Sequence, residues 1–124
     1  MSLKRKDLIK QMNEASSVVL REKGYIGFVD VLIQMGKVTK EDYEAWRMGK
    51  VHCLEEVISV NLAKVNHMLR TFQRNCRKGN LRPSRTAYGS WGKGPKRPLR
   101  FSKSGDPNIE EAYSTHFLRP REEA

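Results

Sequence analysis

The sequence predicts a mainly α protein with a four- to five-helix, bundle-like core and a small β-hairpin or irregular Gly/Pro-rich basic segment before the last helix. Three observations support this prediction. Apolar residues recur at steps of three and four through most of residues 3–78. Glycines stand where each helical run ends. Beyond Gly79, prolines and glycines interrupt every helical pattern until residue 106.

The length of 124 residues fits a single domain, 1–124. Its expected parts are a helical core at 3–78, a basic Gly/Pro-rich segment at 79–105, a C-terminal helix at 106–118 and a tail at 119–124. The first residues are either native or a cloning remnant, which the sequence does not decide.

The first two helices are expected at 3–22 and at about 26–35. An apolar stripe marks the first, and Gly24 ends it. The second is dense in large apolar residues, which predicts a central place in the core, and Gly36 ends it. The residues of the two stripes are Leu8, Met12, Ala15 and Val19, then Phe28, Val31, Leu32 and Met35.

A third helix is expected to begin at Thr39. Thr39 and Asp42 have the spacing of a capping box, and acidic residues in a first turn suit the positive end of the helix dipole. Tyr43 and Trp46 give this helix an apolar inward face, and Gly49 ends it.

The fourth and longest helix is expected at 52–78. Gly79 closes it, and Pro83 prevents it from resuming. Cys53 and Cys76 would then lie about 35 Å apart at 1.5 Å per residue, too far to form a disulfide. Its apolar stripe is Leu54, Ile58, Leu62, Val65, Leu69, Phe72 and Cys76.

The two cysteines are therefore expected to be reduced thiols, which favours a cytoplasmic protein. The chain has no run of about 18 apolar residues that could span a membrane. Its basic N-terminus is not followed by the apolar stretch of a secretory signal. We expect neither a membrane nor a cofactor among its partners.

Two short strands at 82–88 and 98–103 are expected to flank a glycine-rich loop at 89–97. Asp106 and Pro107 then have the positions of a cap and a first-turn residue of the last helix. The inward side of that helix is expected to carry Ile109, Ala112, Tyr113, His116 and Phe117.

Positive charge is concentrated in one acid-free stretch, 57–105. The chain has 24 Lys and Arg against 14 Asp and Glu, a formal net charge of +10. Twelve of the cations fall in this stretch, while the rest of the chain is nearly neutral. Such asymmetry is typical of proteins that meet nucleic acid or another polyanion. The helix dipole accounts for part of the charge at the end of the 52–78 helix, but not for the charge of 82–103.

Aromatic residues are interleaved with these cations. Cations bind phosphates through counterion release, and unpaired bases stack on exposed rings. We therefore expect contact with a nucleic-acid backbone at low sequence specificity, with Tyr88 or Trp91 stacking on a base; DNA and RNA are not distinguished. The predicted contact residues are Arg74, Arg77, Lys78, Arg82, Arg85, Tyr88, Trp91, Lys93, Lys96, Arg97, Arg100 and Lys103.

A second candidate is an anion site formed by Ser102, Lys103, Ser104 and Gly105, just before the last helix. Free backbone N–H groups, two hydroxyls and a lysine can hold a phosphate there. The alternative is that Ser104 or Asp106 simply caps the helix, in which case Asp106 would repel an anion.

Residues 28–48 have the length of a helix-turn-helix, but the expected second helix opens with acids that would face phosphates unfavourably. An α-hairpin within the core is the preferred interpretation. The ligand-type residues His52, Cys53, His67 and Cys76 do not have the paired spacing of a zinc site.

The sequence contains no arrangement that predicts a catalytic residue, so we favour a non-catalytic nucleic-acid-binding protein. The alternative is a protein-interaction or assembly module that docks on an acidic partner or on a second copy of the chain. A third hypothesis is a phosphate-ligand-binding protein or small enzyme, with His116 as the nearest general base to residues 102–105.

Overall fold

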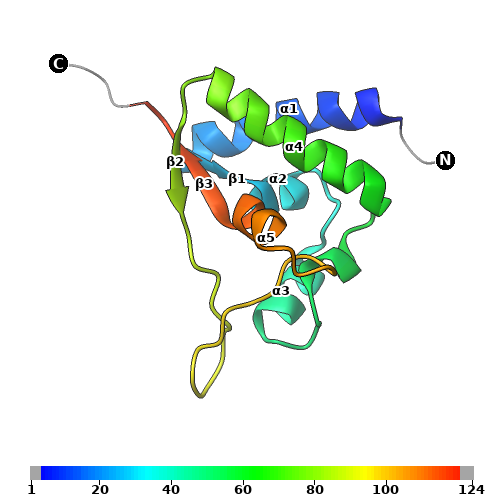
Figure 1. Ribbon diagram of the computed structural model, residues 1–124, viewed down its shortest axis with the longest axis vertical. Helices are drawn as coiled ribbons and strands as arrows, with labels where there is room; N and C mark the ends of the chain where they lie inside the picture. The colour runs from blue at the N-terminus through cyan, green and yellow to red at the C-terminus, as the bar shows by residue number, and fades with distance from the viewer. Residues whose placement is uncertain (1–3, 121–124) are drawn as a thin grey trace.

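The computed structural model describes residues 4–120, in which five α-helices, one short 3-10 helix and a three-stranded antiparallel sheet pack together (Figure 1). The expected mainly α class with a small β element is confirmed. The helices pack against the sheet and one another, and a helix bundle is not confirmed. In this part of the chain, no helix is both long and apolar enough to cross a membrane.

Helices α1 (Arg5–Lys23) and α4 (Leu62–Lys78) lie side by side and run in the same direction along one edge of the molecule (Figure 1). The predicted stripe of α1 is buried, and the side chain of Asn75 on α4 donates a hydrogen bond to Asn13 on α1 at 3.1 Å. Gly24 ends α1 with φ of +81°, a conformation that glycine adopts without strain.

Helices α2 (Phe28–Gln34) and α3 (Lys40–Arg47) follow as predicted. The Thr39 hydroxyl accepts a hydrogen bond from the backbone N–H of Asp42 at 3.1 Å, so this cap is confirmed. Trp46 is fully buried, and its indole N–H donates to the backbone carbonyl of Arg100 at 2.8 Å. Helix α3 is thereby fixed to the segment that follows β2.

The predicted continuous helix at 52–78 is wrong. A 3-10 helix, η1 (Leu54–Val57), comes first, and α4 begins only after Asn61, whose side chain accepts from the N–H of Ala63. The N–H groups of Leu54 and Glu55 donate to the carbonyls of Arg100 and Phe101. Tertiary pairing with the basic segment therefore replaces the helical hydrogen bonds that the apolar spacing predicted.

Two expectations drawn from that helix change with it. Leu62 is 41% exposed and does not belong to the buried stripe. The calculated separation of Cys53 from Cys76 no longer applies, although both are buried free thiols.

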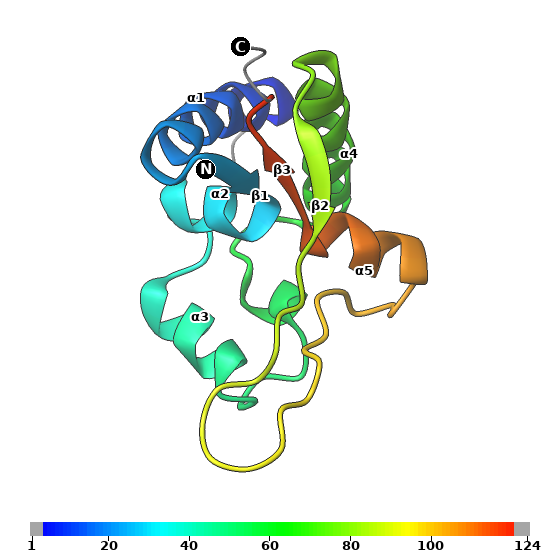
Figure 2. The same ribbon diagram turned by 90° about the vertical axis from the view of Figure 1, so that its left-hand side faces the viewer.

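The expected strand at 82–88 forms over Arg82–Arg85, but its strand partner is not the 98–103 segment. Strand β2 (Arg82–Arg85) pairs with β3 (Thr115–Leu118), which also pairs with β1 (Tyr25–Gly27), so β3 is the central strand and β2 an outer one (Figure 2). The backbone of 98–103 pairs with the end of the 82–88 segment through an isolated bridge between Gly89 and Pro98 and a hydrogen bond from Leu99 N–H to the Tyr88 carbonyl.

The last helix, α5 (Pro107–Ser114), begins as predicted, with the Asp106 side chain accepting from Asn108 N–H at 2.8 Å. It ends before the predicted 118, because Thr115 turns into the extended backbone of β3. His116 and Phe117 therefore point to opposite faces of the sheet rather than lying on one helix face.

The predicted tail is partly outside the described residues, at 121–124. Its first residue, Arg119, is held, because the guanidinium donates to the carbonyl of Leu20 at 2.9 Å near the end of α1.

Gly27 allows the sheet and α2 to approach closely. A Cβ at this position would lie 2.7 Å from His116 Cδ2 and 2.9 Å from Asp30 Oδ2. We therefore expect Gly27→Ala to lower the free energy of unfolding by about 1–3 kcal/mol, the usual cost of overpacking. Gly89→Ala is the matched control, because its Cβ would meet only the Lys96 Cβ at 4.0 Å. Equal stability of the two variants in urea denaturation would contradict the argument.

Candidate nucleic-acid interface

The twelve cations of the acid-free stretch do not share one surface. Some lie on α4 or on β2, and others on the loop at 89–97, at the opposite end of the molecule from α4 (Figure 1). A single ligand surface covering all of 57–105 is therefore excluded by the fold. The cations of α4, of β2 and of the 89–97 loop therefore belong to separate surfaces.

The glycine-rich loop is docked on α3. The backbone N–H of Trp91 donates to the backbone carbonyl of Arg47 at 2.6 Å. The Arg47 guanidinium lies 4.7 Å from the centre of the Trp91 ring. Tyr43 meets the same ring edge-on at 5.8 Å. Trp91 is nevertheless 41% exposed, and the loop residues Lys93, Lys96 and Arg97 are exposed as well.

Tyr88 is only 8% exposed, so the stacking role expected for it does not fit its position. Its ring packs among Trp46, Phe101 and His116, and its hydroxyl lies 2.8 Å from His116 Nε2. Burial raises the pKa of Tyr88 above its usual range. Phe101 is buried as well, so only Trp91 of these three aromatics presents a ring to solvent.

The predicted anion site at 102–105 is occupied by this chain's own carboxylates. Glu110 accepts from Phe101 N–H at 3.0 Å, from Ser102 N–H at 2.7 Å and from the Ser102 hydroxyl at 2.5 Å. Glu55 accepts from Lys103 N–H at 2.8 Å. These carboxylates belong to η1 and α5, so the donors that they occupy are not open to a phosphate.

The rest of this segment is similarly committed. The Ser104 hydroxyl accepts from Asp106 N–H at 3.2 Å, and the Ser102 hydroxyl accepts from Gly105 N–H at 3.0 Å. Arg100 donates through Nε and Nη2 to the carbonyls of Ser102 and Lys103. Arg100 therefore stabilises its own loop, and the Lys103 side chain is exposed to solvent.

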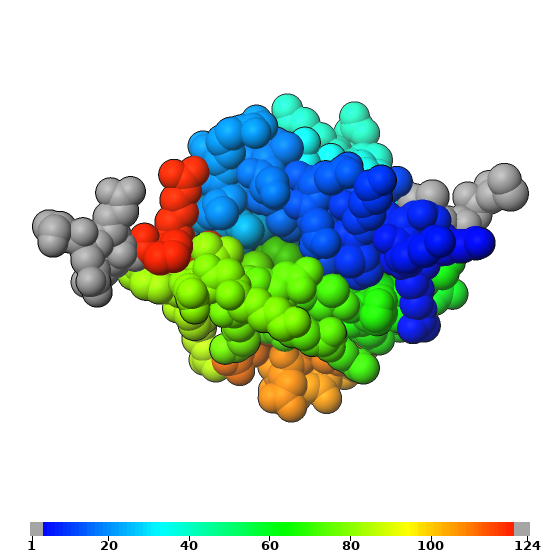
Figure 3. All heavy atoms as spheres, turned by 90° about the horizontal axis from the view of Figure 1, so that it is seen from above, coloured from blue at the N-terminus to red at the C-terminus, as the bar shows by residue number. Residues whose placement is uncertain are grey.

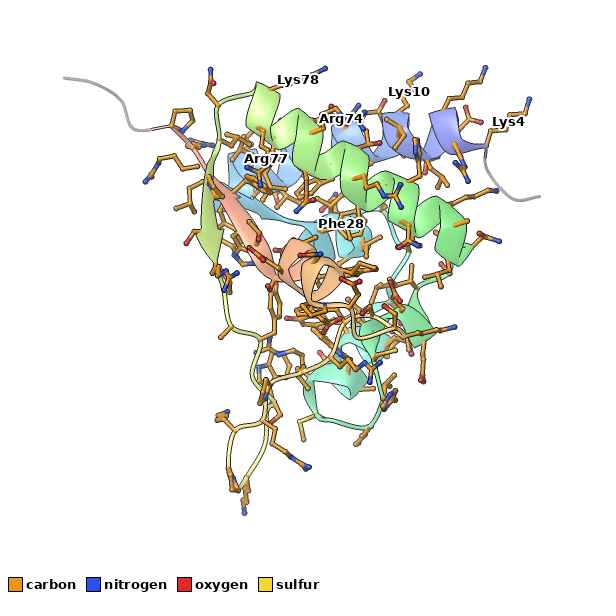
Figure 4. All side chains as sticks on the ribbon, viewed as in Figure 1. Lys4, Lys10, Phe28, Arg74, Arg77 and Lys78 are labelled. Atoms are coloured by element: carbon orange, nitrogen blue, oxygen red, sulfur yellow. The ribbon has the colours of Figure 1, made fainter. Side chains whose placement is uncertain are left out.

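A different basic surface is formed where α1 and α4 lie side by side. Seen along this edge, the two helices form one broad face of the molecule (Figure 3). Cations of both helices project from it: Lys10, Arg74 and Lys78 do so in Figure 4. We call this surface the basic ridge and define it by six exposed residues, Lys6, Lys10 and Arg21 on α1 and Arg70, Arg74 and Lys78 on α4.

The ridge cations of α1 share one face of the helix. With 3.6 residues per turn, Lys6, Lys10 and Arg21 lie within about 60° of one another, and Glu14 and Asp7 lie on the flank of this face, about 20° and 40° beyond Arg21. Glu14 lines a shallow hollow with Gln34 and Met35, which places that flank against the α2 side. Helix α4 carries no acid at all.

Ridge cations have no carboxylate partner among residues 4–120. The ion pairs in that range join Lys23 to Asp30 at 3.1 Å and Arg85 to Glu111 at 2.9 Å. Arg85 is thus partly neutralised, unlike the ridge residues. Arg77 differs again, because its guanidinium lies 6.0 Å from the centre of the Phe117 ring, toward the sheet.

The predicted contact set and the ridge overlap at Arg74 and Lys78. Sequence reasoning did not include Arg70 of α4 among the contact residues. It missed Lys6, Lys10 and Arg21 because α1 holds enough acids to look neutral when its charges are only counted. A helical projection of α1 would have placed these three cations on one face, with Glu14 and Asp7 at its edge.

Metal or nucleophile chemistry finds little support in the described part of the chain. No group of three or more His, Cys, Asp or Glu comes together there as a metal site. Burial raises the pKa of both thiols, that of Cys76 to about 12, which keeps them protonated and unreactive at neutral pH.

No protein-family model, curated protein sequence or solved structure matches this chain significantly.

His116 yields a pH prediction. Its ring stacks on Tyr25 at 4.8 Å, and burial lowers its pKa from 6.5, against the opposing effect of Asp30. The unfolded chain then binds the proton more readily, so stability should be full above about pH 6.5 and should decline as the pH falls through the lowered value.

The test is urea unfolding between pH 8 and pH 5 for the native chain and for His116→Gln. We expect a shallower decline in the variant, while His52→Gln, at an exposed position, should follow the native curve. Identical profiles for all three proteins would refute the assignment to His116.

Proposed function

We propose that this protein is a non-catalytic nucleic-acid-binding protein that contacts the phosphate backbone through the basic ridge of α1 and α4. The observation that carries the proposal is that six exposed cations share this surface without a carboxylate partner among the described residues. Cations already paired with carboxylates contribute less to phosphate binding, because only net positive sites release condensed counterions.

The ridge is also held rigidly. Buried side chains of α1 and α4 belong to the same core, including Met12 and Phe72, and the Asn13–Asn75 hydrogen bond joins the helices at the surface. Backbone rigidity lets several cations engage one polyanion without ordering the chain first. Such preorganisation lowers the entropic cost of binding.

Low sequence specificity follows from the composition of the ridge. None of its six residues is aromatic, and the two helices lie lengthwise along this face (Figure 3). Phosphate contacts fix position without reading bases. We therefore expect similar affinity for oligonucleotides of different sequence.

The assembly alternative has a smaller basis in the structure. Met48 and Trp91 are large exposed apolar residues, and a Cβ on the neighbouring Gly92 would lie 3.2 Å from Met48 Cε, so they form one small patch. Exposed patches of this kind can bind a protein partner. Light scattering of the purified chain tests self-association through this patch. A stable dimer or larger species would support it, and a monomer would exclude it.

The test of nucleic-acid binding compares two triple variants with equal loss of charge. Lys10→Ala/Arg74→Ala/Lys78→Ala removes ridge cations, and Lys93→Ala/Lys96→Ala/Arg97→Ala removes exposed loop cations. Fluorescence anisotropy with a labelled duplex should show a 10-fold or greater loss of affinity for the ridge variant and less than 3-fold for the loop variant.

Salt dependence gives a second readout. The slope of log K against log salt concentration should become shallower by about 2–3 for the ridge variant, since each phosphate contact contributes about 0.9 on duplex DNA. Absence of binding at low salt, insensitivity to salt or a larger loss in the loop variant would each reject the ridge as the contact surface.

A further inference from the structure

A separate groove lies between the basic segment and α5. Its volume is about 880 Å³, within the range of small-molecule sites. One wall is formed by residues 85–89, another by 96–99, and the third by α5. The groove does not include any of the six ridge residues, so it is a distinct feature of the surface.

The surface that lines the groove is mostly apolar. Ala87, Pro98, Leu99 and Pro107 contribute, and Phe101 closes the lining from the core side. Leu99 is half-buried, whereas Ala87, Pro98 and Pro107 are exposed. The groove therefore favours a ligand with an apolar body, because burying that body releases water from these surfaces.

The groove is lined by both acids and cations, but its acids already have partners within the chain. The Glu110 carboxylate accepts three hydrogen bonds from residues 101–102, and Glu111 pairs with Arg85. Lys96 and Arg97 also line the groove, and neither forms an ion pair within the described residues. The acids are thus already satisfied, and two cations at one wall remain to meet an anionic group.

We infer that this groove binds a small amphipathic anion, in which a flat apolar body lies on Leu99, Pro98 and Pro107 and an acidic group meets Lys96 and Arg97. The combination of an apolar lining with a few converging polar groups is the usual composition of small-molecule sites. The flanking hydrogen bonds from Leu99 N–H to Tyr88 and from Ser90 N–H to Arg97 hold the two walls at a fixed distance. The groove is therefore present before a ligand arrives.

The probe is 8-anilinonaphthalene-1-sulfonate, an aromatic anion whose fluorescence rises in apolar surroundings. Titration of the folded chain should show one saturable site per molecule. Amide chemical-shift changes in an NMR titration should be confined to residues 85–89, 96–101 and 107–114.

Two variants test the chemistry. Lys96→Ala/Arg97→Ala should weaken probe binding by 5-fold or more, and Ala87→Trp should block the groove while leaving both cations in place. The matched control is Lys93→Ala, which removes a cation of the same loop that does not line the groove. It should bind the probe within 2-fold of the native chain.

Several outcomes would overturn this inference: no saturable binding, chemical-shift changes centred elsewhere, or equal affinity in Lys96→Ala/Arg97→Ala and the native chain. The double variant changes only exposed side chains, so it remains informative even if Ala87→Trp does not fold. The ridge triple variant should bind the probe normally, which separates failure of this site from failure of nucleic-acid binding.

Discussion

The carboxylates of Glu55 and Glu110 hold the segment between β2 and α5 in place. Their charge-assisted hydrogen bonds from the N–H groups of 101–103 replace the backbone pairing that this segment would otherwise lack. Glu55 also accepts from the buried Tyr113 hydroxyl at 2.8 Å. With these contacts made, Phe101 stacks on Tyr113 and the Arg100 carbonyl meets Trp46. One pair of side chains therefore joins η1, α3 and α5.

The sequence predicted those parts of the fold that depend on interactions between residues close together in the chain. The stripe of α1, the Thr39 cap and the Asp106 cap depend on residues a few positions apart, and all were predictable. At the break at 58–61, Ser59 pairs with Lys37, 22 residues away, and β2 pairs with β3, at least 30 residues away. No periodicity within a segment reveals such partners, so the apolar spacing of 52–78 was mistaken for one helix.

The candidate interface was predictable to a similar degree. Counting charges along the chain located Arg74 and Lys78 but could not show that α1 lies beside them. Nor could it show that Arg100 and the N–H groups of 101–103 are used within the chain. Burial of Tyr88 depends on His116 and Trp46, both distant in sequence. The distribution of charge along the chain therefore predicted a cationic surface. Which cations share that surface depends on how the helices pack.

Pro83 has a consequence for how the sheet ends. Thr86 N–H donates to the Ser114 carbonyl, and N–H groups alternate sides along a strand, so the nitrogen of Pro83 faces the open side of β2. That nitrogen carries no hydrogen, and Arg82 and Arg85 flank it on the same strand. A further strand added at this edge would lack a backbone N–H donor at Pro83 and would lie next to two bulky cationic side chains. The outer edge of β2 thus resists the strand addition by which exposed sheets grow into aggregates.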